Sequence, residues 1–294
     1  MMLPVVKEPT GTAIDRYQLY ASSKILNLSS SVDYFFGGIR VDDESNGTYA
    51  RLTFDNLIKE RDGYTLTPTV RIRMDLPGTR QKMKLVLDDD DDSANRNTQT
   101  SGITTRDRSR GFNASLRFVI DQKSKWNLST DLGVRMRSSP WLNPFVRLRG
   151  RRSFLLTENL EMRFIQELYE FLETGAETRS TLDFDYPLGS NMLFRFGNNA
   201  IWTDELDYFT YSNGPSLYKK LSHKRALGIH ARASGDNSNG STYTNYELFV
   251  SYRQLIYKDW IFAELTPGLS YPKALDFQQV AFIKISIQSL FGNF

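Results

Sequence analysis

Arginine recurs at every second position in several segments of this chain, and aspartate or glutamate residues share the same phase. Arg71 and Arg73 form the first such pair. A row of guanidinium groups binds anions through paired hydrogen bonds, or pairs with carboxylates on a neighbouring segment. We expect one interior to be lined by Arg71, Arg73, Arg117, Arg135, Arg137, Arg147, Arg149, Arg163, Arg179, Asp183, Asp185, Arg195, Glu247 and Glu264.

The balance of charge in this interior bears on its chemistry. Sixteen basic residues, Lys82 among them, and nine acidic residues share the interior phase, an excess of seven positive charges in a chain with a formal net charge of only +3. A water-filled pore with this lining concentrates anions. Alternatively, arginine and carboxylate rows pair across neighbouring strands and hold a filled interior. Arg147, Arg149 and Arg163, near Glu161, are candidates for such a ladder.

The elements that position these residues are predicted to be strands. Apolar and polar residues alternate from Thr65 to Leu76, and a period of two indicates a β-strand. Strands of soluble proteins usually last about 5 or 6 residues, whereas these segments have the length that crosses a bilayer at a tilt. The fourteen predicted strands are 47–59, 64–76, 80–90, 110–121, 125–138, 143–155, 159–172, 177–187, 191–203, 207–220, 223–234, 241–254, 259–270 and 278–291.

Length and hydropathy agree with this interpretation. The chain has 294 residues and a mean hydropathy of −0.44, and it contains no stretch of 18 apolar residues that could form a membrane helix. A barrel needs none, because only every second residue faces lipid. The predicted fold is all-β: a transmembrane antiparallel up-and-down β-barrel of about 14 strands, within a range of 12 to 16.

Connection lengths predict the orientation of the barrel. One set of connections is uniformly short, as periplasmic turns are, and the other contains the longest and most polar segments, 88–110 and 234–241. An even strand count places both termini on the periplasmic side. We therefore predict an integral protein of the bacterial outer membrane with both termini in the periplasm, surrounded by outer-membrane lipid and lipopolysaccharide.

The first 46 residues differ from the rest, so we divide the chain into a segment 1–46 and a barrel 47–294. Thr12 and Asp15 resemble a capping box, and apolar residues then recur at helical spacing as far as Leu28. A short amphipathic helix is expected. It could plug the lumen, lie on the inner membrane surface as a periplasmic segment, dock on a periplasmic protein partner, or rest against the barrel as a tail.

Two other kinds of site find weaker support. The run Asp88, Asp89, Asp90, Asp91 and Asp92 could bind a divalent cation, but like charges repel into an extended, solvated loop, which is the favoured interpretation. No other metal-ligand spacing, phosphate-binding loop or nucleic-acid module is present. We expect no cofactor.

An outer-membrane lipid hydrolase is the least favoured function. Such enzymes pair a serine with a histidine, often in a motif resembling His-x-Ser-Asn-Gly. Here Ser212 is followed by Asn213 and Gly214, but no histidine precedes it, and the two histidines are His223 and His230. We expect a protein that is not an enzyme.

Several segments resemble a family of uncharacterised outer-membrane proteins from Gammaproteobacteria. The likeness rests on Val32 to Gly37, on Arg71 to Pro77 with the charged run that follows, and on Lys258 to Ser270. The alternating strand from Phe282 to Phe294 also resembles the C-terminal signal read by the barrel assembly machinery, an expected partner during biogenesis. The resemblance spans most of the chain and implies fold and location, but it carries no catalytic motif.

Two functions remain open from the sequence. The first is a porin-like channel or transporter for small polar solutes, with a leaning toward anions. The second is a non-catalytic barrel that anchors or partners an envelope assembly or export complex, with residues 1–46 as its periplasmic handle. Neither involves nucleic acid.

Overall fold

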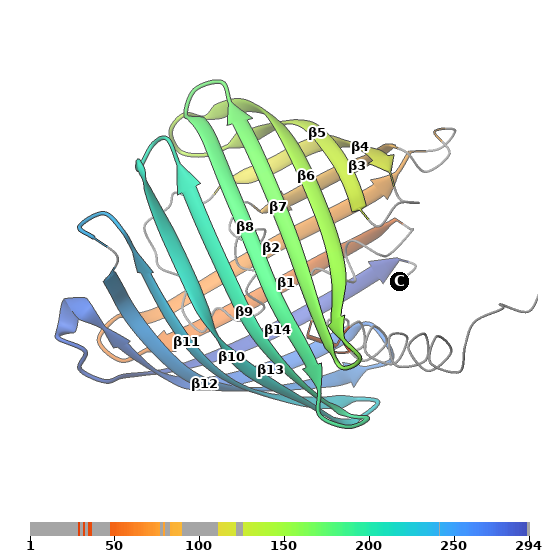
Figure 1. The fold of residues 1–294 in the computed structure, drawn as a ribbon. Helices are drawn as coiled ribbons and strands as arrows, with labels where there is room; N and C mark the ends of the chain where they lie inside the picture. Colours follow the sequence, from red (N-terminus) through yellow and green to blue (C-terminus); the bar gives the residue numbers. More distant parts are fainter. Residues whose placement is uncertain are drawn as a thin grey trace, which may run out of the picture.

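The computed structural model describes residues 29, 32, 35, 36, 48–76, 79, 83–89, 111–121, 126–240 and 242–292. Fourteen antiparallel strands close into one barrel, shown in Figure 1. They are β1 (Tyr49–Lys59), β2 (Gly63–Asp75), β3 (Met83–Asp89), β4 (Phe112–Asp121), β5 (Trp126–Met136), β6 (Leu142–Thr157), β7 (Leu160–Phe171), β8 (Gly175–Pro187), β9 (Met192–Thr203), β10 (Tyr208–Ser222), β11 (Arg225–Asp236), β12 (Thr242–Tyr257), β13 (Ile261–Pro272) and β14 (Val280–Gly292). A short 3₁₀ helix, η1 (Lys273–Leu275), joins the last two strands.

The predicted strand count and up-and-down order are confirmed. Every strand pairs with its neighbours in sequence, and β1 closes the barrel against β14, from Tyr49 opposite Gly292 to Lys59 opposite Phe282. Closure leaves no sheet edge, which is the condition for a β-structure to sit in lipid. The expected helix that begins near Thr12 lies outside the described residues.

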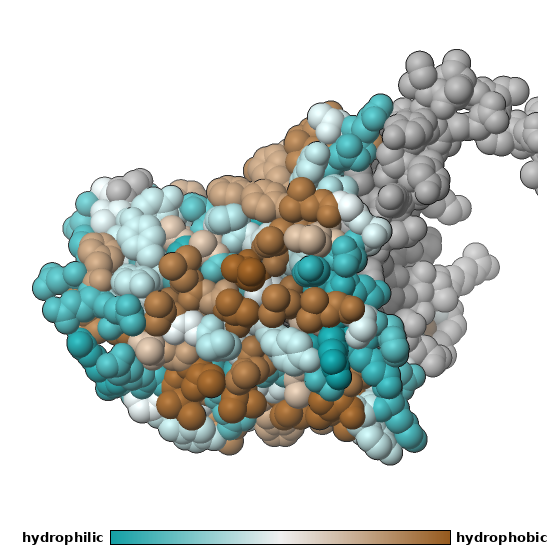
Figure 2. Space-filling model, turned by 90° about the horizontal axis from the view of Figure 1, so that it is seen from below, coloured by the Kyte–Doolittle hydropathy of each residue, from teal (hydrophilic) through white to brown (hydrophobic). Residues whose placement is uncertain are grey.

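The period-two pattern separates an outer from an inner face. On β2, Arg71 and Arg73 are buried. Leu66 and Val70, which have the opposite phase, are 50% and 37% exposed. Figure 2 shows apolar side chains spread across the outer face, with hydrophilic residues gathered toward the ends of the molecule. In the described part of the chain no helix is long and apolar enough to span a bilayer.

The barrel has two rims. We call the rim that carries the start of β1 and the end of β14 the terminal rim; the C-terminal label in Figure 1 marks it. The β2–β3 connection and every second connection after it lie at this rim. The opposite, distal rim carries the remaining connections, among them the longest one, between β3 and β4.

Candidate functional site

The inner wall carries a ladder of ion pairs from β4 to β7. Asp131, which is completely buried, accepts hydrogen bonds from Arg117 on one side, at 3.0 Å to Nε, and from Arg147 on the other. Arg149 donates to Glu167 at 3.1 Å. These residues face each other directly in the strand register, so the alternation of charge between neighbouring strands builds the ladder.

The ladder continues to β9. Arg163 lies 2.9 Å from Asp183, and Arg195 Nε lies 2.6 Å from Asp185. Charge-assisted pairs of this kind satisfy groups that would otherwise be costly to bury. The wall therefore adopts the predicted pairing of charged rows across neighbouring strands. The partners differ from the prediction, because Arg147 and Arg149 pair with Asp131 and Glu167 and not with Glu161.

Some arginine side chains of the inner wall lie over aromatic rings. Arg135 lies over the ring of Phe171, 3.8 Å from its centroid, and its Nη1 lies 3.2 Å from Glu177. Tyr169 stacks on Phe171 at 5.5 Å and accepts a hydrogen bond from Arg147 at 3.0 Å. Stacking holds a guanidinium plane in one orientation, so this part of the wall is fixed in geometry as well as in charge.

The predicted lining residues lie on the inner wall. Arg137 follows the last residue of β5 and is only partly buried, and the side chain of Glu264 is 15% exposed. The others are exposed by 9% or less: Arg71, Arg73, Arg117, Arg135, Arg147, Arg149, Arg163, Arg179, Asp183, Asp185, Arg195 and Glu247.

Sequence reasoning missed two inward acids. Asp88 belongs to β3 and lies 3.5 Å from Arg71, whereas we had placed it in a solvated acidic loop. Glu177, near the start of β8, bonds to both Arg135 and Arg179. Of the sixteen predicted basic residues, fifteen lie within the described part of the chain, and with Asp88 and Glu177 added the acids number eleven, so the excess there is four.

The proposed cation site in the acidic run finds no support from Asp88 and Asp89, because both belong to β3. Asp90, Asp91 and Asp92 lie outside the described residues. Across the described ranges, no three His, Asp or Glu side chains gather in a group that could hold a metal ion.

The wall from β10 to β14 is different, because hydroxyl groups and rings replace most of the charges. His230 is buried and its two ring nitrogens lie 2.9 Å from Ser216 Oγ and 3.0 Å from Ser251 Oγ. Phe249 stacks on the imidazole at 4.7 Å. The hydrolase hypothesis paired His230 with Ser212, but Ser212 faces Ser234 in the register, about 13 Å along the strand from the position opposite His230.

On β9 to β14 the inner wall becomes apolar at the terminal rim. Inward side chains of five strands make up a surface that we call the seat: Leu193, Tyr218, Ala226, Phe262 and Leu290. Each is exposed by 5% or less.

Residues of the N-terminal segment cover the seat. Val32, exposed by 3%, packs with Leu193 and Tyr218. Phe35, exposed by 5%, meets the ring of Phe262 edge-on at 5.7 Å, and Phe36 lies 5.1 Å from Tyr218. The described residues of this segment have helical backbone.

Comparison with known proteins identifies the fold. No family model matches the chain, and no curated protein matches it. CdiB from Acinetobacter baumannii has a TM-score of 0.52 at 9% identity, covering 83% of this chain and 60% of that one. OccK11 from Pseudomonas aeruginosa has a TM-score of 0.46 at 12% identity, covering 84% and 96%. A KdgM porin in complex with disordered oligogalacturonate has a TM-score of 0.39 at 6% identity, covering 81% and 98%.

The closed barrel with an apolar outer face and a charged inner face defines the class of protein: an outer-membrane β-barrel. The similarity to CdiB, at a TM-score of 0.52, concerns the barrel fold alone.

Proposed function

We propose that this protein is an outer-membrane channel for small polar solutes, with a preference for anions, and that its N-terminal segment closes the lumen at the terminal rim. The observation that carries the proposal is the contrast within one inner wall. It is charged or hydroxylated over much of its area, as a water-filled passage requires, and at the terminal rim it carries the apolar seat that Val32, Phe35 and Phe36 cover.

Barrel size supports the passage. Eight strands enclose an interior that side chains fill, and barrels of 16 to 18 strands leave an aqueous channel. Fourteen strands lie nearer the second group. Titratable side chains outnumber apolar ones such as Ile165 and Ile201 on the inner wall of β2 to β9, whereas a barrel filled as a protein core would favour branched apolar residues there.

The preference for anions rests on the inner charge. An excess of four positive charges among the described lining residues raises the local concentration of anions, because low-dielectric walls focus the field along the lumen. Pairing with carboxylates weakens this field without cancelling it. Arg71 and Arg195 illustrate the pairing, since Arg71 lies 3.5 Å from Asp88 and Arg195 lies 2.6 Å from Asp185.

Closure by the N-terminal segment explains the seat. Apolar residues on the wall of an aqueous lumen would be exposed to water unless something covered them, and burial of such a side chain contributes about 1.5–3 kcal/mol. Val32 and Phe35 are the covering residues. We assign the terminal rim to the periplasm, since the longest connection, β3–β4, lies at the distal rim.

Liposome swelling tests the proposal. Proteoliposomes that contain the chain without residues 1–40 should swell faster in small organic anions than in cations of equal size, and the full chain should admit both more slowly. No swelling by the shortened chain, once circular dichroism has confirmed its β-structure, would contradict a channel.

The ion-pair ladder itself favours a second candidate, a barrel that anchors or partners an envelope assembly. Its inward charges are satisfied by one another, as on the β4 to β9 wall, so they need no solute. This candidate predicts a stable partner after affinity capture from membranes, lost when residues 1–46 are deleted. A barrel that is always solitary in detergent would contradict it.

A further inference from the structure

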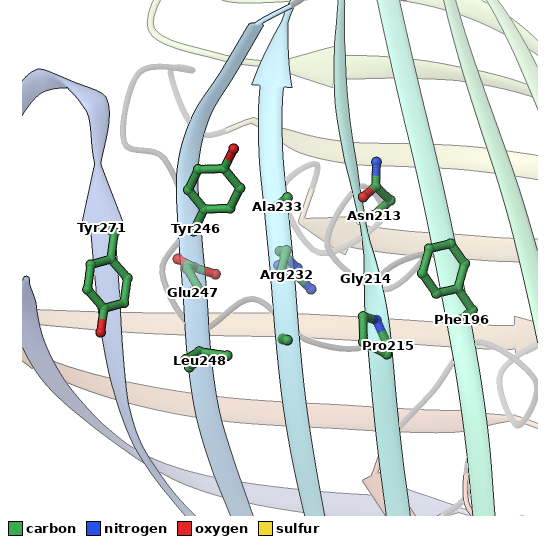
Figure 3. A pocket seen from close by; sticks show the side chains of 11 residues that line it. Phe196, Asn213, Gly214, Pro215, Arg232, Ala233, Tyr246, Glu247, Leu248 and Tyr271 are labelled. Carbon is green, nitrogen blue, oxygen red and sulfur yellow. The ribbon is translucent and has the colours of Figure 1, made fainter. Parts of the chain in front are cut away.

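The outer face carries a hollow lined mostly by outward-facing residues, although Arg232 and Glu247, which have the inward phase, also border it. It has a volume of about 320 Å³ and lies over β9 to β13. Figure 3 shows it between Phe196 on β9 and Tyr271 on β13, with the short side chains of β10 and β11 between them. We call it the lateral groove.

Differences in side-chain length make the groove. Its floor is built from Pro215, Ala231 and Ala233, which rise little above the backbone. Next to Pro215, a Cβ on Gly214 would overlap the carbonyl of Ala231, so the backbones of β10 and β11 approach each other closely there. The walls are longer side chains of the neighbouring strands.

The walls place the groove on the membrane face. Leu248 and Tyr246 are exposed at 51% and 43%, and Phe196 at 37%, as lipid-facing residues of a barrel are. The groove therefore continues the apolar outer surface and is a depression in it. Its volume is about twice the ~150 Å³ of a cavity that takes up benzene, so it has room for a segment of one alkyl chain.

The distal end of the groove meets an aromatic cluster. Tyr243 lies 5.8 Å from Tyr246 and 5.6 Å from Tyr211, and Tyr246 lies 5.7 Å from Phe277. Tyrosine favours the membrane interface, where its ring is in apolar surroundings and its hydroxyl is hydrated. A molecule in the groove would thus have its polar end at the distal rim and its tail toward the middle of the bilayer.

We propose that the lateral groove binds one acyl chain of a lipopolysaccharide molecule in the outer leaflet. The choice of lipid rests on the proposed orientation, which places the distal rim outside. Lys273, exposed in η1 two residues beyond Tyr271, supplies a cation at the height of the phosphorylated headgroup. Lipid chains pack on all of the outer surface, but the groove offers this one a depression between Phe196 and Tyr271.

Retention of lipid during purification tests the site. The full chain is extracted from outer membranes, and bound lipopolysaccharide is counted by native mass spectrometry. We expect about one retained molecule, and at least a fivefold loss in Ala233→Phe and in Ala231→Phe, which fill the groove. Ala114→Phe is the matched control, because Ala114 is a partly exposed, outward-facing alanine on β4, away from the groove. Lys273→Glu should weaken retention while leaving the groove open.

The outcomes separate this inference from the channel. Equal retention by the wild type and both groove-filling variants, or no retained lipid in the wild type, would overturn the site. A retained phospholipid in place of lipopolysaccharide would overturn the choice of lipid. Solute entry into proteoliposomes should be the same for Ala233→Phe and the wild type. A failure of the wild-type protein to admit solutes would therefore contradict the channel and leave the lipid site unaffected.

Discussion

Phe35→Ala should open the channel, because Phe35 joins the N-terminal segment to the seat through a buried aromatic contact. Its ring is 5% exposed and meets Phe262 edge-on at 5.7 Å and Phe36 at 5.9 Å. Truncation to alanine removes the ring from Ala226 and Leu290 as well. No residue of the channel wall is changed.

The expected magnitude follows from these contacts. Burying a phenylalanine side chain contributes about 1.5–3 kcal/mol, and an edge-on aromatic pair adds about 0.5–1.5 kcal/mol. We take a loss of about 3 kcal/mol from these two contributions. Only the contact with Phe262 is counted as an aromatic pair, because Phe36 belongs to the same segment as Phe35. Each step of about 1.4 kcal/mol is tenfold in an equilibrium constant, so the ratio of closed to open channels should fall about 150-fold.

Single-channel recording in planar bilayers measures this ratio as open probability. Phe35→Leu is the control: it keeps an apolar side chain in the seat and should shift the ratio far less. Unitary conductance should be the same in all three proteins, because the wall is unaltered. An open probability that Phe35→Ala leaves at the wild-type value would refute closure by this contact.

Three further predictions concern the wall and the strands. Asp131→Asn should lower the free energy of unfolding in detergent by about 3–5 kcal/mol, because it leaves the buried Arg117 and Arg147 without their shared carboxylate. Gly214→Ala should reduce the yield of folded barrel on urea-gradient refolding, since its methyl group would overlap the backbone of Ala231. Arg71→Ala should move the reversal potential in a salt gradient toward zero, because it removes one positive charge from the lumen.

Each of these predictions has a matched control. Asp62→Asn removes an exposed partner of Lys59 and should cost less than about 1 kcal/mol; an equal loss in both variants would contradict the role of burial. Gly150→Ala meets its nearest neighbour, Leu128, at 3.3 Å and should refold almost normally. Asp88→Ala should increase anion selectivity where Arg71→Ala decreases it, and shifts of the same sign would exclude the electrostatic explanation.

The barrel was predictable from sequence because the alternation of apolar and polar residues is a property of each strand by itself. Alternation within each strand, as from Leu66 to Leu76, reports which side chains face lipid, and closure then follows from strand number and short connections. The inward arginines were predictable for the same reason. Asp88 was missed because four further aspartates follow it and the run resembles a loop, although Asp88 has the same phase as Lys84.

The seat and the groove were not predictable, because both depend on several strands at once. Leu193, Ala226 and Phe262 each occur near a strand end, where an inward apolar residue cannot be distinguished from a shift in phase. Only the register brings them together. The groove likewise requires that Pro215 and Ala231 be neighbours with longer side chains on either side, which no single segment of sequence indicates.

The pairing of inward charges lies between these cases. Opposite signs on successive strands predict some ladder, and we expected one around Arg147 and Arg149. The partners were assigned incorrectly because Glu161 and Glu167 lie six residues apart on the same face of β7, and only the register shows that Glu167 is the acid opposite Arg149.

Conductance of the chain without residues 1–40, compared with the full chain in the same planar bilayer, tests the central claim most directly. We predict stepwise conductance from the shortened chain, with a reversal potential shifted toward the anion, and rare openings from the full chain. Silence from a shortened chain that is folded and inserted would contradict an aqueous channel closed by its N-terminal segment.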